Sequence, residues 1–185
     1  MHEREREGGR RVDGIRLDGM TAPAATFIRA AAALDAAPIH ALHMAAIRAI
    51  GESHYTALQR HAWCGERTPQ HYLASIATRL MRVAMANAAA ERASRLLGFA
   101  QLNLATGAVE GVYVQPDMQR AGIGRQLLQA LESAACGGGA QTLWLDASLN
   151  AVPFYTRQGY EVLSLHEHPV GPQLTIPCVR MRKRL

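Results

Sequence analysis

The sequence contains few cysteines, and their spacing is not that of a metal or disulfide framework. Cys64, Cys136 and Cys178 are odd in number, and no two of them are in C-x-x-C spacing. This argues against a disulfide scaffold and against a zinc site. It predicts buried or idle thiols in a reducing cytoplasm and no metal in the functional site.

Long apolar runs are also missing. The longest ones fall far short of the ~20 residues that a membrane-spanning helix needs. The charged N-terminal segment is not followed by the apolar stretch of a secretory signal. We therefore expect a cytoplasmic protein without a membrane partner.

Lysine is nearly absent. Lys183 is the only lysine among 20 basic residues, and the formal net charge is +5 with a pI of about 9.6. Arginine suits bidentate contacts with phosphate, although a chain rich in arginine and alanine also fits a genome of high GC content. The charge favours an anionic ligand. No basic stripe interleaved with aromatic residues is present, so nucleic acid is not the expected partner.

The overall composition is that of an ordinary globular protein. The 185 residues include 49% hydrophobic and 19% charged residues, which suits one domain with a sizeable core. Residues 1–26 have few large apolar side chains, and the charges of residues 1–19 balance, which predicts a disordered tail. We expect residues 27–185 to form a single domain. Whether residues 1–19 belong to the native product is open, because Met20 is a second candidate start.

Hydrophobic periodicity divides the rest of the chain into helices and strands. Apolar residues at helical spacing predict helices from Asp35 to Ile50, over Tyr55–Trp63, and from Pro69 to Leu80. Strands are predicted at 27–30, 81–85, 96–103, 109–114, 142–145, 160–166 and 174–181, further helices at 122–135 and 151–158, and a turn at 87–93. This order predicts an α/β fold with a mixed sheet.

The sharpest local signal is a strand that leads into a glycine-containing helix start, Val112-Tyr113-Val114-Gln115-Pro116-Asp117-Met118-Gln119-Arg120-Ala121-Gly122-Ile123-Gly124-Arg125. A helix N-terminus presents about four backbone N–H groups without intrahelical partners, and its macrodipole favours an anion. Gly122 and Gly124 let a phosphate approach these groups, and Arg120 and Arg125 add positive charge. The spacing is neither G-x-x-x-x-G-K-[ST] nor G-x-G-x-x-G. Alone, it also fits a tight strand-to-helix connection.

Two blocks of sequence resemble the GNAT superfamily of CoA-dependent N-acetyltransferases. Gln119-Arg120-Ala121-Gly122-Ile123-Gly124 matches that family's Q/R-x-x-G-x-G/A pyrophosphate loop, and the preceding Val112 to Pro116 resembles its fourth strand. Residues 145–160 resemble its second conserved block, in which an Asn precedes a Phe-Tyr pair and a Gly-aromatic pair. The resemblance covers about residues 27–185, is strongest over 109–165 and is thin before residue 80. It implies a mostly antiparallel central sheet flanked by helices, with strands four and five splayed apart to form a CoA cleft.

The resemblance implies acetyl-CoA as the cosubstrate, with no metal, and assigns its contacts. The loop would hold the pyrophosphate, and the fourth strand would pair with the pantetheine arm. Asn150 would contact the pantetheine or the backbone beside it, although it also fits an N-cap of the helix expected from Ala151. The implied cofactor-binding residues are Val112, Tyr113, Val114, Gln119, Arg120, Ala121, Gly122, Ile123, Gly124, Arg125 and Asn150.

Two residues are candidates for catalysis. Tyr155 matches the family's general acid, which protonates the departing CoA thiolate; the alternative is a core tyrosine. Glu110 precedes the loop and, by strict alternation along the strand, shares a face with Val112 and Val114. A carboxylate there would take a proton from the acceptor amine. The alternatives are a solvated acid without a role, and a water chain as the base.

The acceptor side is predicted from the helical region. Tyr55, Gln59 and Trp63 fall at i, i+4 and i+8 and so share one face of a helix. The arrangement resembles one that walls the substrate cleft of some bacterial family members. We assign Tyr55, Trp63 and His54 to the acceptor, with a packed aromatic stripe as the alternative. Four further histidines are expected at the surface or at helix caps and not as metal ligands: His40, His43, His166 and His168.

Together, these features predict an N-acetyltransferase that moves an acetyl group from acetyl-CoA to a primary amine by direct attack in a ternary complex. One alternative is a non-catalytic CoA-binding regulatory or interaction module of the same fold. Another, suggested by charge alone, is a nucleotide- or nucleic-acid-binding α/β protein. The acceptor, a small-molecule or peptide amine, is not readable from the sequence. The oligomeric state is open, and a homodimer is the oligomer we consider.

Overall fold

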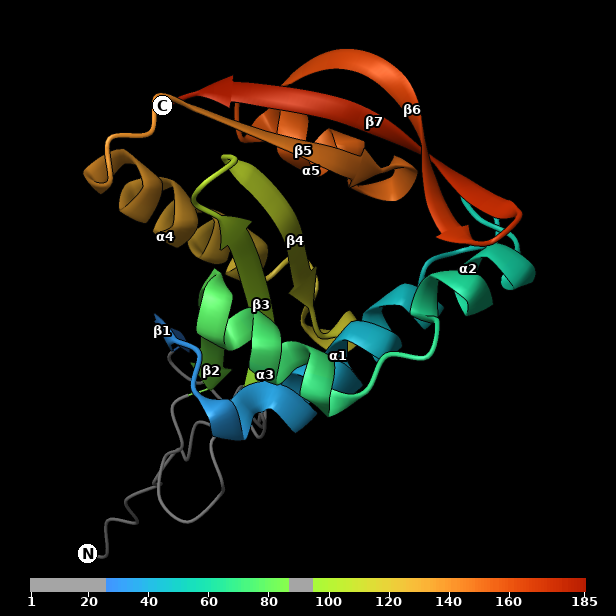
Figure 1. The fold of residues 1–185 in the computed structure, drawn as a ribbon, viewed down its shortest axis with the longest axis horizontal. Coiled ribbons are helices and arrows are strands. Elements are labelled where there is room, and N and C mark those ends of the chain that lie inside the picture. The colour runs from blue at the N-terminus through green and yellow to red at the C-terminus, as the bar shows by residue number, and fades with distance from the viewer. Residues whose placement is uncertain (1–25, 87–94) are drawn as a thin grey trace, which may run out of the picture.

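A mixed sheet forms the centre of the fold (Figure 1). The computed structural model describes residues 26–86 and 95–185. It contains a 7-stranded sheet of order β1-β2-β3-β4-β5-β7-β6, in which neighbouring strands are antiparallel except β4 and β5. The predicted tail, apart from Thr26, and the predicted turn at 87–93 lie outside the described residues.

The elements follow one another in an order close to the predicted one. The strands are β1 (Thr26–Ala30), β2 (Leu80–Ala86), β3 (Leu96–Asn103), β4 (Ala108–Val114), β5 (Thr142–Ser148), β6 (Glu161–Gly171) and β7 (Leu174–Arg184). The helices are α1 (Ala36–Arg48), α2 (Ala57–Cys64), α3 (Pro69–Thr78), α4 (Ile123–Gly137) and α5 (Val152–Arg157). Short 3-10 turns are η1 (Ala33–Asp35), η2 (Pro116–Met118) and η3 (Leu149–Ala151). The predicted α/β fold is confirmed.

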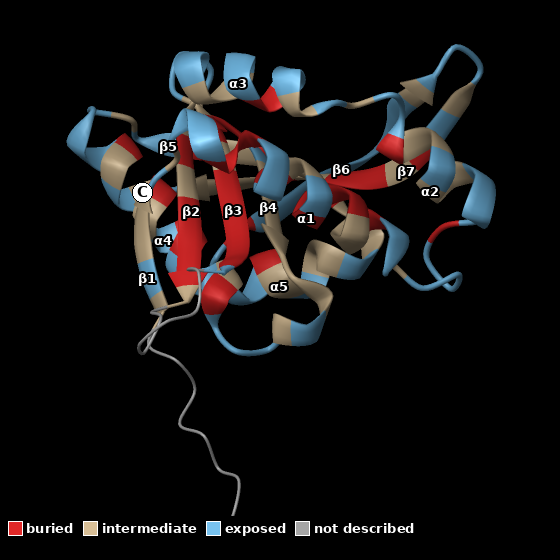
Figure 2. Cartoon of the chain, turned by 90° about the horizontal axis from the view of Figure 1, so that it is seen from below, coloured by how far each residue is buried: buried red, intermediate tan, exposed pale blue. Residues whose placement is uncertain are grey.

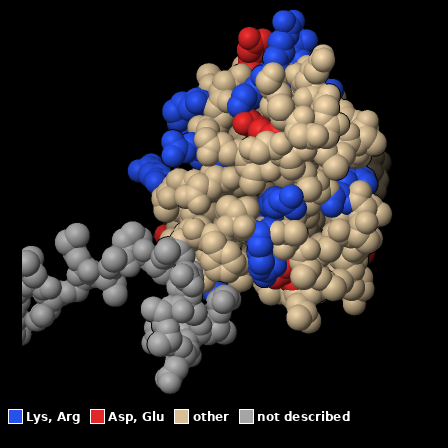
Figure 3. Space-filling view, turned by 90° about the vertical axis from the view of Figure 1, so that its left-hand side faces the viewer, with Lys and Arg blue, Asp and Glu red and all other residues tan. Residues whose placement is uncertain are grey.

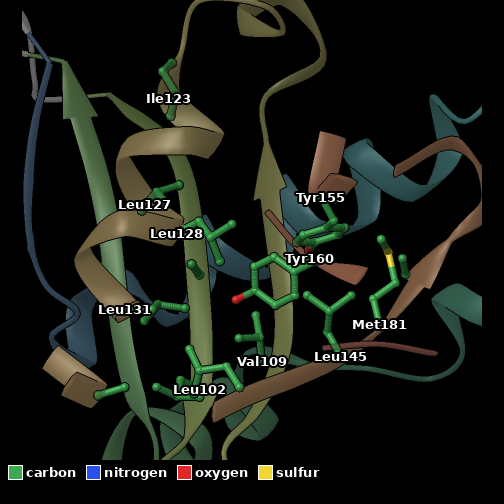
Figure 4. Close-up of a cluster of buried hydrophobic side chains, with 14 of the residues drawn as sticks. Leu102, Val109, Ile123, Leu127, Leu128, Leu131, Leu145, Tyr155, Tyr160 and Met181 are labelled. Carbon is green, nitrogen blue, oxygen red and sulfur yellow. The ribbon is translucent and has the colours of Figure 1, made fainter. Parts of the chain in front are cut away.

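Helix α4 covers one face of the sheet. Leu127, Leu128 and Leu131 belong to a buried cluster with Leu102 of β3 and Leu145 of β5. Figure 4 shows these leucines pointing from one side of α4 toward the strands. Their spacing is the i, i+4 spacing of an amphipathic helix, so the apolar stripe that predicts the helix is the one that docks it.

Helices α1 and α3 cover the opposite face. Ile39 and Leu42 of α1 and Tyr72 of α3 pack with Val83 and Phe99 of the sheet. Figure 2 shows the buried residues following β2 and β3 between these helical layers. The sheet is therefore apolar on both faces, and its backbone edges are positioned by packing from either side.

The predicted bounds of two helices in this layer need correction. Asp35, the predicted first residue of α1, precedes that helix and bonds to no N–H of it. Its carboxylate accepts from the Ala32 backbone N–H at 2.7 Å and pairs with Arg29 at 2.6 Å. Leu80, the predicted end of α3, begins β2, because α3 ends at Thr78.

The three cysteines carry no disulfide. Cys64 and Cys178 are buried and Cys136 is exposed, all as free thiols. Within the described ranges, no helix has both the length and the apolar character needed to cross a bilayer.

Candidate active site

Strands β4 and β5 are neighbours in the sheet but separate almost at once. Their register pairs Ala108 with Trp144 and no other positions of these two fully described strands. β4 nevertheless continues to Val114, while β5 pairs with β7 from Thr142 to Ser148. The β5-facing edge of β4 beyond Ala108 therefore has no strand partner. This confirms the predicted splay between the fourth and fifth strands.

A β-bulge in β4 changes the direction of Glu110. Leu102 of β3 pairs with Val109, and Gln101 pairs with Gly111, so Glu110 is the extra residue between two ladder positions. Such a bulge shifts the alternation of side chains by one residue.

Glu110 consequently does not share a face with Val112 and Val114, and that prediction is wrong. The two valines pack against the α4 cluster, whereas Glu110 lines a pocket on the α1 and α3 side of the sheet. Both carboxylate oxygens of Glu110 accept from the Arg79 Nε at 3.1 Å, and one also accepts from the Gln101 amide.

The segment between β4 and α4 leaves its backbone N–H groups unused. Within the described parts of the chain, none of the N–H groups of residues 119–125 donates to another backbone group. The segment is mostly exposed, and α4 begins at Ile123, one residue after the predicted Gly122. Exposed N–H groups at the start of a helix, together with the helix dipole, form an anion site.

The backbone conformation explains why glycine occupies position 122. φ is 66° at Arg120 and 80° at Gly122, both left-handed values. Glycine adopts this conformation without the cost that a Cβ brings. Space is not the reason, because a Cβ added at Gly122 would meet nothing within 4 Å. At Gly124, an added Cβ would lie 3.5 Å from Phe154, an ordinary contact. The surface over Gly122 is thus open to a ligand.

Asn150 lies near the predicted cofactor path with its side chain exposed. It belongs to η3, and α5 begins at Val152 with Ala151 as its N-cap residue and no side-chain cap. The alternative role of Asn150 as an N-cap is therefore not realised. Its side-chain amide forms no hydrogen bond with the described residues.

Tyr155 lies in α5, next to the buried cluster under α4 (Figure 4). Its ring packs edge-on against Phe154 and Tyr160, with centroids 4.9 and 5.7 Å away. Burial raises the pKa of Tyr155, and the nearby Tyr113 raises it further. A phenol with a raised pKa stays protonated at neutral pH and is a proton donor there.

A pocket of about 190 Å³ lies beside the bulge, between β3 and β4 on one side and α1, α3 and the α2–α3 connection on the other. We call it the β4 pocket. It combines aromatic and ionisable side chains: His43, Arg67, His71, Tyr72, Ser75, Phe99, Gln101, Glu110, Gly111 and Tyr113. Its volume is below the roughly 300–1,000 Å³ of pockets for drug-sized ligands. It therefore suits a small molecule or one end of a larger one.

His43 is buried in this pocket, and the prediction of a surface histidine is wrong. Its Nδ1 lies 2.8 Å from the Tyr72 hydroxyl, and its ring centroid lies 3.9 Å from that of Tyr113. Its Nε2 is buried without a hydrogen-bond partner among the described residues. A buried polar atom without a partner is costly, so this nitrogen suits contact with an occupant of the pocket.

The buried state of His43 predicts a pH-dependent stability. Burial, with smaller effects of Arg67 and His40, lowers the pKa of His43 to about 3. The unfolded chain protonates this group below about pH 6.5, while the folded protein does not, so stability falls as the pH drops from 6.5 toward 3. At pH 5 the loss is about 2 kcal/mol. Urea unfolding from pH 7.5 to 4.5 measures it.

The matched variant for this measurement is His43→Phe, which keeps an aromatic ring but has no group to titrate. We expect its free energy of unfolding to depend less on pH below 6.5 than that of the wild type, whatever its absolute stability. Parallel pH profiles for the two proteins would contradict this account.

Tyr55 has a structural role. It does not lie on the helix face from which it was predicted to contact the acceptor. It precedes α2, whose N-cap is Thr56, and is only 1% exposed. Its hydroxyl donates to the Pro177 carbonyl at 2.7 Å and accepts from the Leu149 N–H at 2.8 Å. Both hydrogen-bonding roles of the hydroxyl are used within the chain, which favours the packing alternative.

The other two predicted acceptor residues lie elsewhere. Trp63 is half-buried against a cluster that includes Met44 and Cys64, and His54 is exposed, with its Nδ1 3.1 Å from the Ser53 hydroxyl. Neither lines the β4 pocket. The predicted acceptor residues and Glu110 are therefore not brought together.

His166 lies beside Asp146 and Cys178, with their potential ligand atoms within 4.8 Å of one another. The spacing of the histidines does not predict this cluster. Arg180 pairs with both oxygens of Asp146, and burial raises the pKa of the Cys178 thiol to about 11. A protonated thiol and a carboxylate already paired with a guanidinium are poor cation ligands. We assign no cation to this cluster.

Sequence reasoning missed the helical side of the β4 pocket. A signal for His43 was present, because it falls at i+4 from Ile39 and i−4 from Ile47, on the apolar stripe of α1. Arg67 had no such signal, since it lies in the connection between α2 and α3 and reaches the pocket only through the tertiary fold.

Basic side chains do not gather into one stripe on the face shown in Figure 3, where they are scattered among uncharged groups. The positive charge of the chain is therefore spread over this face. The charges within the site are therefore a better guide to its ligand than the net charge of the chain.

Comparison with known proteins adds family and fold information. A family model described as the acetyltransferase (GNAT) domain matches residues 53–185. The protein named "Uncharacterized N-acetyltransferase YjcF" of Bacillus subtilis (strain 168) is 44% identical over 61 residues, which are 33% of this chain. The match spans 44% of the length of that relative, less than half of it.

Solved structures share the fold over most of the chain. One is a GCN5-related N-acetyltransferase from Rhodopseudomonas palustris, also titled aminotransferase, class II. It has a TM-score of 0.77 and 26% identity, and the match covers 90% of this chain and 100% of that chain. The PaiA N-acetyltransferase of Thermoplasma acidophilum, solved in complex with coenzyme A, has a TM-score of 0.69 and 17% identity, covering 87% and 99% of the two chains. At that identity, the likeness concerns the fold alone.

Proposed function

Because the chain belongs to the GNAT acetyltransferase family and is an acyltransferase, we propose that it moves an acetyl group from acetyl-CoA to a primary amine by direct attack in a ternary complex. The observation that carries this proposal is the row of unused backbone N–H groups at residues 119–125, directly after the open edge of β4. An extended ligand with a diphosphate fits both features at once.

The loop would hold the diphosphate. Backbone N–H groups from Gln119 to Arg125 have no backbone partners in the described chain, and the dipole of the 15-residue helix α4 adds to their attraction for an anion. The guanidinium groups of Arg120 and Arg125, both exposed, add charge beside them. Gly122 leaves the approach open.

The open edge of β4 would guide the pantetheine arm. The backbone of Val112 and Val114 pairs with β3 on one side, and β5 has already moved away on the other. Amide groups of an extended ligand can take the place of a strand there. The exposed Asn150, in η3 directly after β5, would be a further contact of the arm.

Tyr155 would act as the general acid. When the amine nitrogen bonds to the acetyl carbon, the carbon–sulfur bond breaks and the sulfur leaves with its electron pair. The Tyr155 hydroxyl gives its proton to that sulfur, so the products are an amide and a free thiol. The raised pKa of Tyr155 keeps the proton on the phenol until it is needed.

Glu110 would receive the proton that the amine loses, directly or through one water. The bulge turns its carboxylate into the β4 pocket, beside the open strand edge. Arg79 and Gln101 fix its orientation. Glu110 would thus both orient the amine and accept its proton.

A kinetic experiment tests this proposal. Acetyl-CoA and a panel of primary amines should give N-acetylated product and free CoA in equal amounts, with intersecting double-reciprocal lines and no acetyl-enzyme by mass spectrometry. Glu110→Gln should lower kcat roughly ten- to hundredfold and leave the Kd for CoA unchanged. Glu161→Gln, an exposed acid on β6, serves as the control. Tight CoA binding with no turnover on any amine would favour a non-catalytic CoA-binding module.

A further inference from the structure

The β4 pocket contains an arginine without an acidic partner. Arg67 forms no salt bridge with any carboxylate in the described residues. Its Nη1 donates to the carbonyls of Trp63 and Cys64, at the C-terminal end of α2. These two bonds fix the guanidinium in place. They leave the edge formed by Nε and Nη2 free, the edge that binds a carboxylate with two parallel hydrogen bonds.

Arg67 lines the β4 pocket together with the aromatic side chains of His43, Tyr72 and Tyr113. After burial, the largest influence on the pKa of each of these three side chains is the charge of Arg67. The charge of Arg67 is therefore close to the space that an occupant of the pocket would fill.

The His43–Tyr72 pair supplies one further donor. His43 is neutral and carries one N–H, and Tyr72 carries one O–H, but the single contact of 2.8 Å between them uses only one of these protons. The other proton is either on the buried Nε2 of His43, which has no partner in the described chain, or on the Tyr72 hydroxyl. In both tautomers the pair retains a donor for an anionic occupant.

The opposite wall carries the opposite charge. Arg67 comes from the helical layer, whereas Glu110 comes from the β4 bulge in the sheet. A cavity of about 190 Å³ between them excludes a bulky ligand end but accepts a small zwitterion. An amine that also carries an anion would meet both walls, with its anion at Arg67 and its neutral amine group donating a hydrogen bond to Glu110, whose charge Arg79 already balances in part.

We propose that the acceptor is an amine that also carries a carboxylate, of the amino-acid class, whose carboxylate binds Arg67 and whose amine is directed at Glu110. This inference rests on the proposed acetyltransferase function and adds the chemical class of its substrate. A carboxylate matches the free planar edge of one guanidinium. Arg67 is thus a specificity-determining residue, and the reaction product is an N-acetylated amino acid.

The test compares L-amino acids with their carboxamides and with the corresponding amines that lack the carboxyl group. Rates are expressed per concentration of neutral amine, which removes differences in amine basicity. For the wild type, we expect kcat/KM to be about ten- to hundredfold higher for the best acids than for their carboxamides. Arg67→Gln should remove this preference by lowering only the values for the acids. Arg67→Lys, which keeps a cation but not the planar edge, should lose part of it.

Two controls show whether a loss of the preference is caused by misfolding of a variant. The Kd for CoA should be unchanged in each variant, and Arg48→Gln, an exposed arginine at the end of α1 and outside the β4 pocket, should retain the full preference. Equal rates on acids and carboxamides in the wild type, or an equal fall on both in Arg67→Gln with CoA binding intact, would overturn the inference. A preference for aminoalkylphosphonates over carboxylates would overturn it as well.

A binding measurement separates this inference from the proposed function. Calorimetric titration of the CoA-bound protein with an amino acid should show binding in the wild type and at least tenfold weaker binding in Arg67→Gln. Absence of turnover on every amine contradicts the proposed function. Absence of amino-acid binding, or equal binding by both proteins, contradicts the carboxylate site alone.

Discussion

Replacing Tyr155 by phenylalanine should lower kcat by about 10²- to 10⁴-fold, with little change in the Kd for CoA. The substitution removes one hydroxyl and keeps the ring that packs against Phe154 and Tyr160. Stability should therefore be nearly unchanged. Release of free thiol from acetyl-CoA at saturating amine measures kcat, and thermal unfolding verifies the fold.

A second phenol in the same cluster provides the control. Tyr160 is buried in the α4-side core, as Tyr155 is, and its ring lies 5.7 Å from that of Tyr155. Tyr160→Phe should keep kcat within about twofold of the wild type, because the Tyr160 hydroxyl donates nothing to the reaction. If Tyr155→Phe is as active as Tyr160→Phe, the general acid is another group or water.

The pH profile offers a second view of the same residue. The pKa of Tyr155 is raised by burial above its ordinary value of about 10. The phenol is therefore fully protonated through the neutral range, and its deprotonation sets no limit on kcat below about pH 10. A fall of activity in acid belongs to protonation of the acceptor amine.

Placing a carboxylate over the helix start should cost about a hundredfold in KM for acetyl-CoA. Gly122→Asp adds a negative charge where the diphosphate would lie, a few ångströms from its oxygens, and repulsion at this distance near a protein surface is worth about 3 kcal/mol. Initial rates at varied acetyl-CoA concentration give the change. The effect should shrink at high salt, because the site is open to solvent.

Gly122→Asn is the matched control for this charge. Asparagine and aspartate are nearly equal in size and tolerate the left-handed conformation better than other side chains, so φ of 80° burdens both variants alike. The asparagine variant should raise KM only a few-fold. Equal effects of the two substitutions would mean that backbone strain, and not charge, controls this position.

The parts of the site that depend on neighbouring residues in the chain could be predicted from the sequence. The loop before α4 and the helix itself follow from a strand end, a glycine and an amphipathic stripe that lie within one short segment. Tyr155 is assigned from its place in the block that resembles the family, and it lies in the short helix predicted there. In each case the local pattern and the tertiary contacts favour the same structure.

The parts of the site that depend on segments distant in the sequence could not be predicted from it. The face on which Glu110 lies is set by the register with β3, where one extra residue reverses the alternation. Tyr55 is removed from its expected helix face by bonds to Pro177 and Leu149, far along the chain. Arg67 acquires its role only when the α2–α3 connection folds over the sheet. No local propensity encodes these three placements.

Because β4 and β5 are bridged at only one position, the hydrophobic core also determines how far apart these two strands lie. With only Ala108 and Trp144 paired, no hydrogen-bond ladder sets the distance between the two portions of the sheet. That distance is set by side chains of the buried core such as Leu127, Leu145 and Tyr160. These residues act as a spacer. A change in their volume alters the width of the cofactor slot without touching any group that binds or reacts.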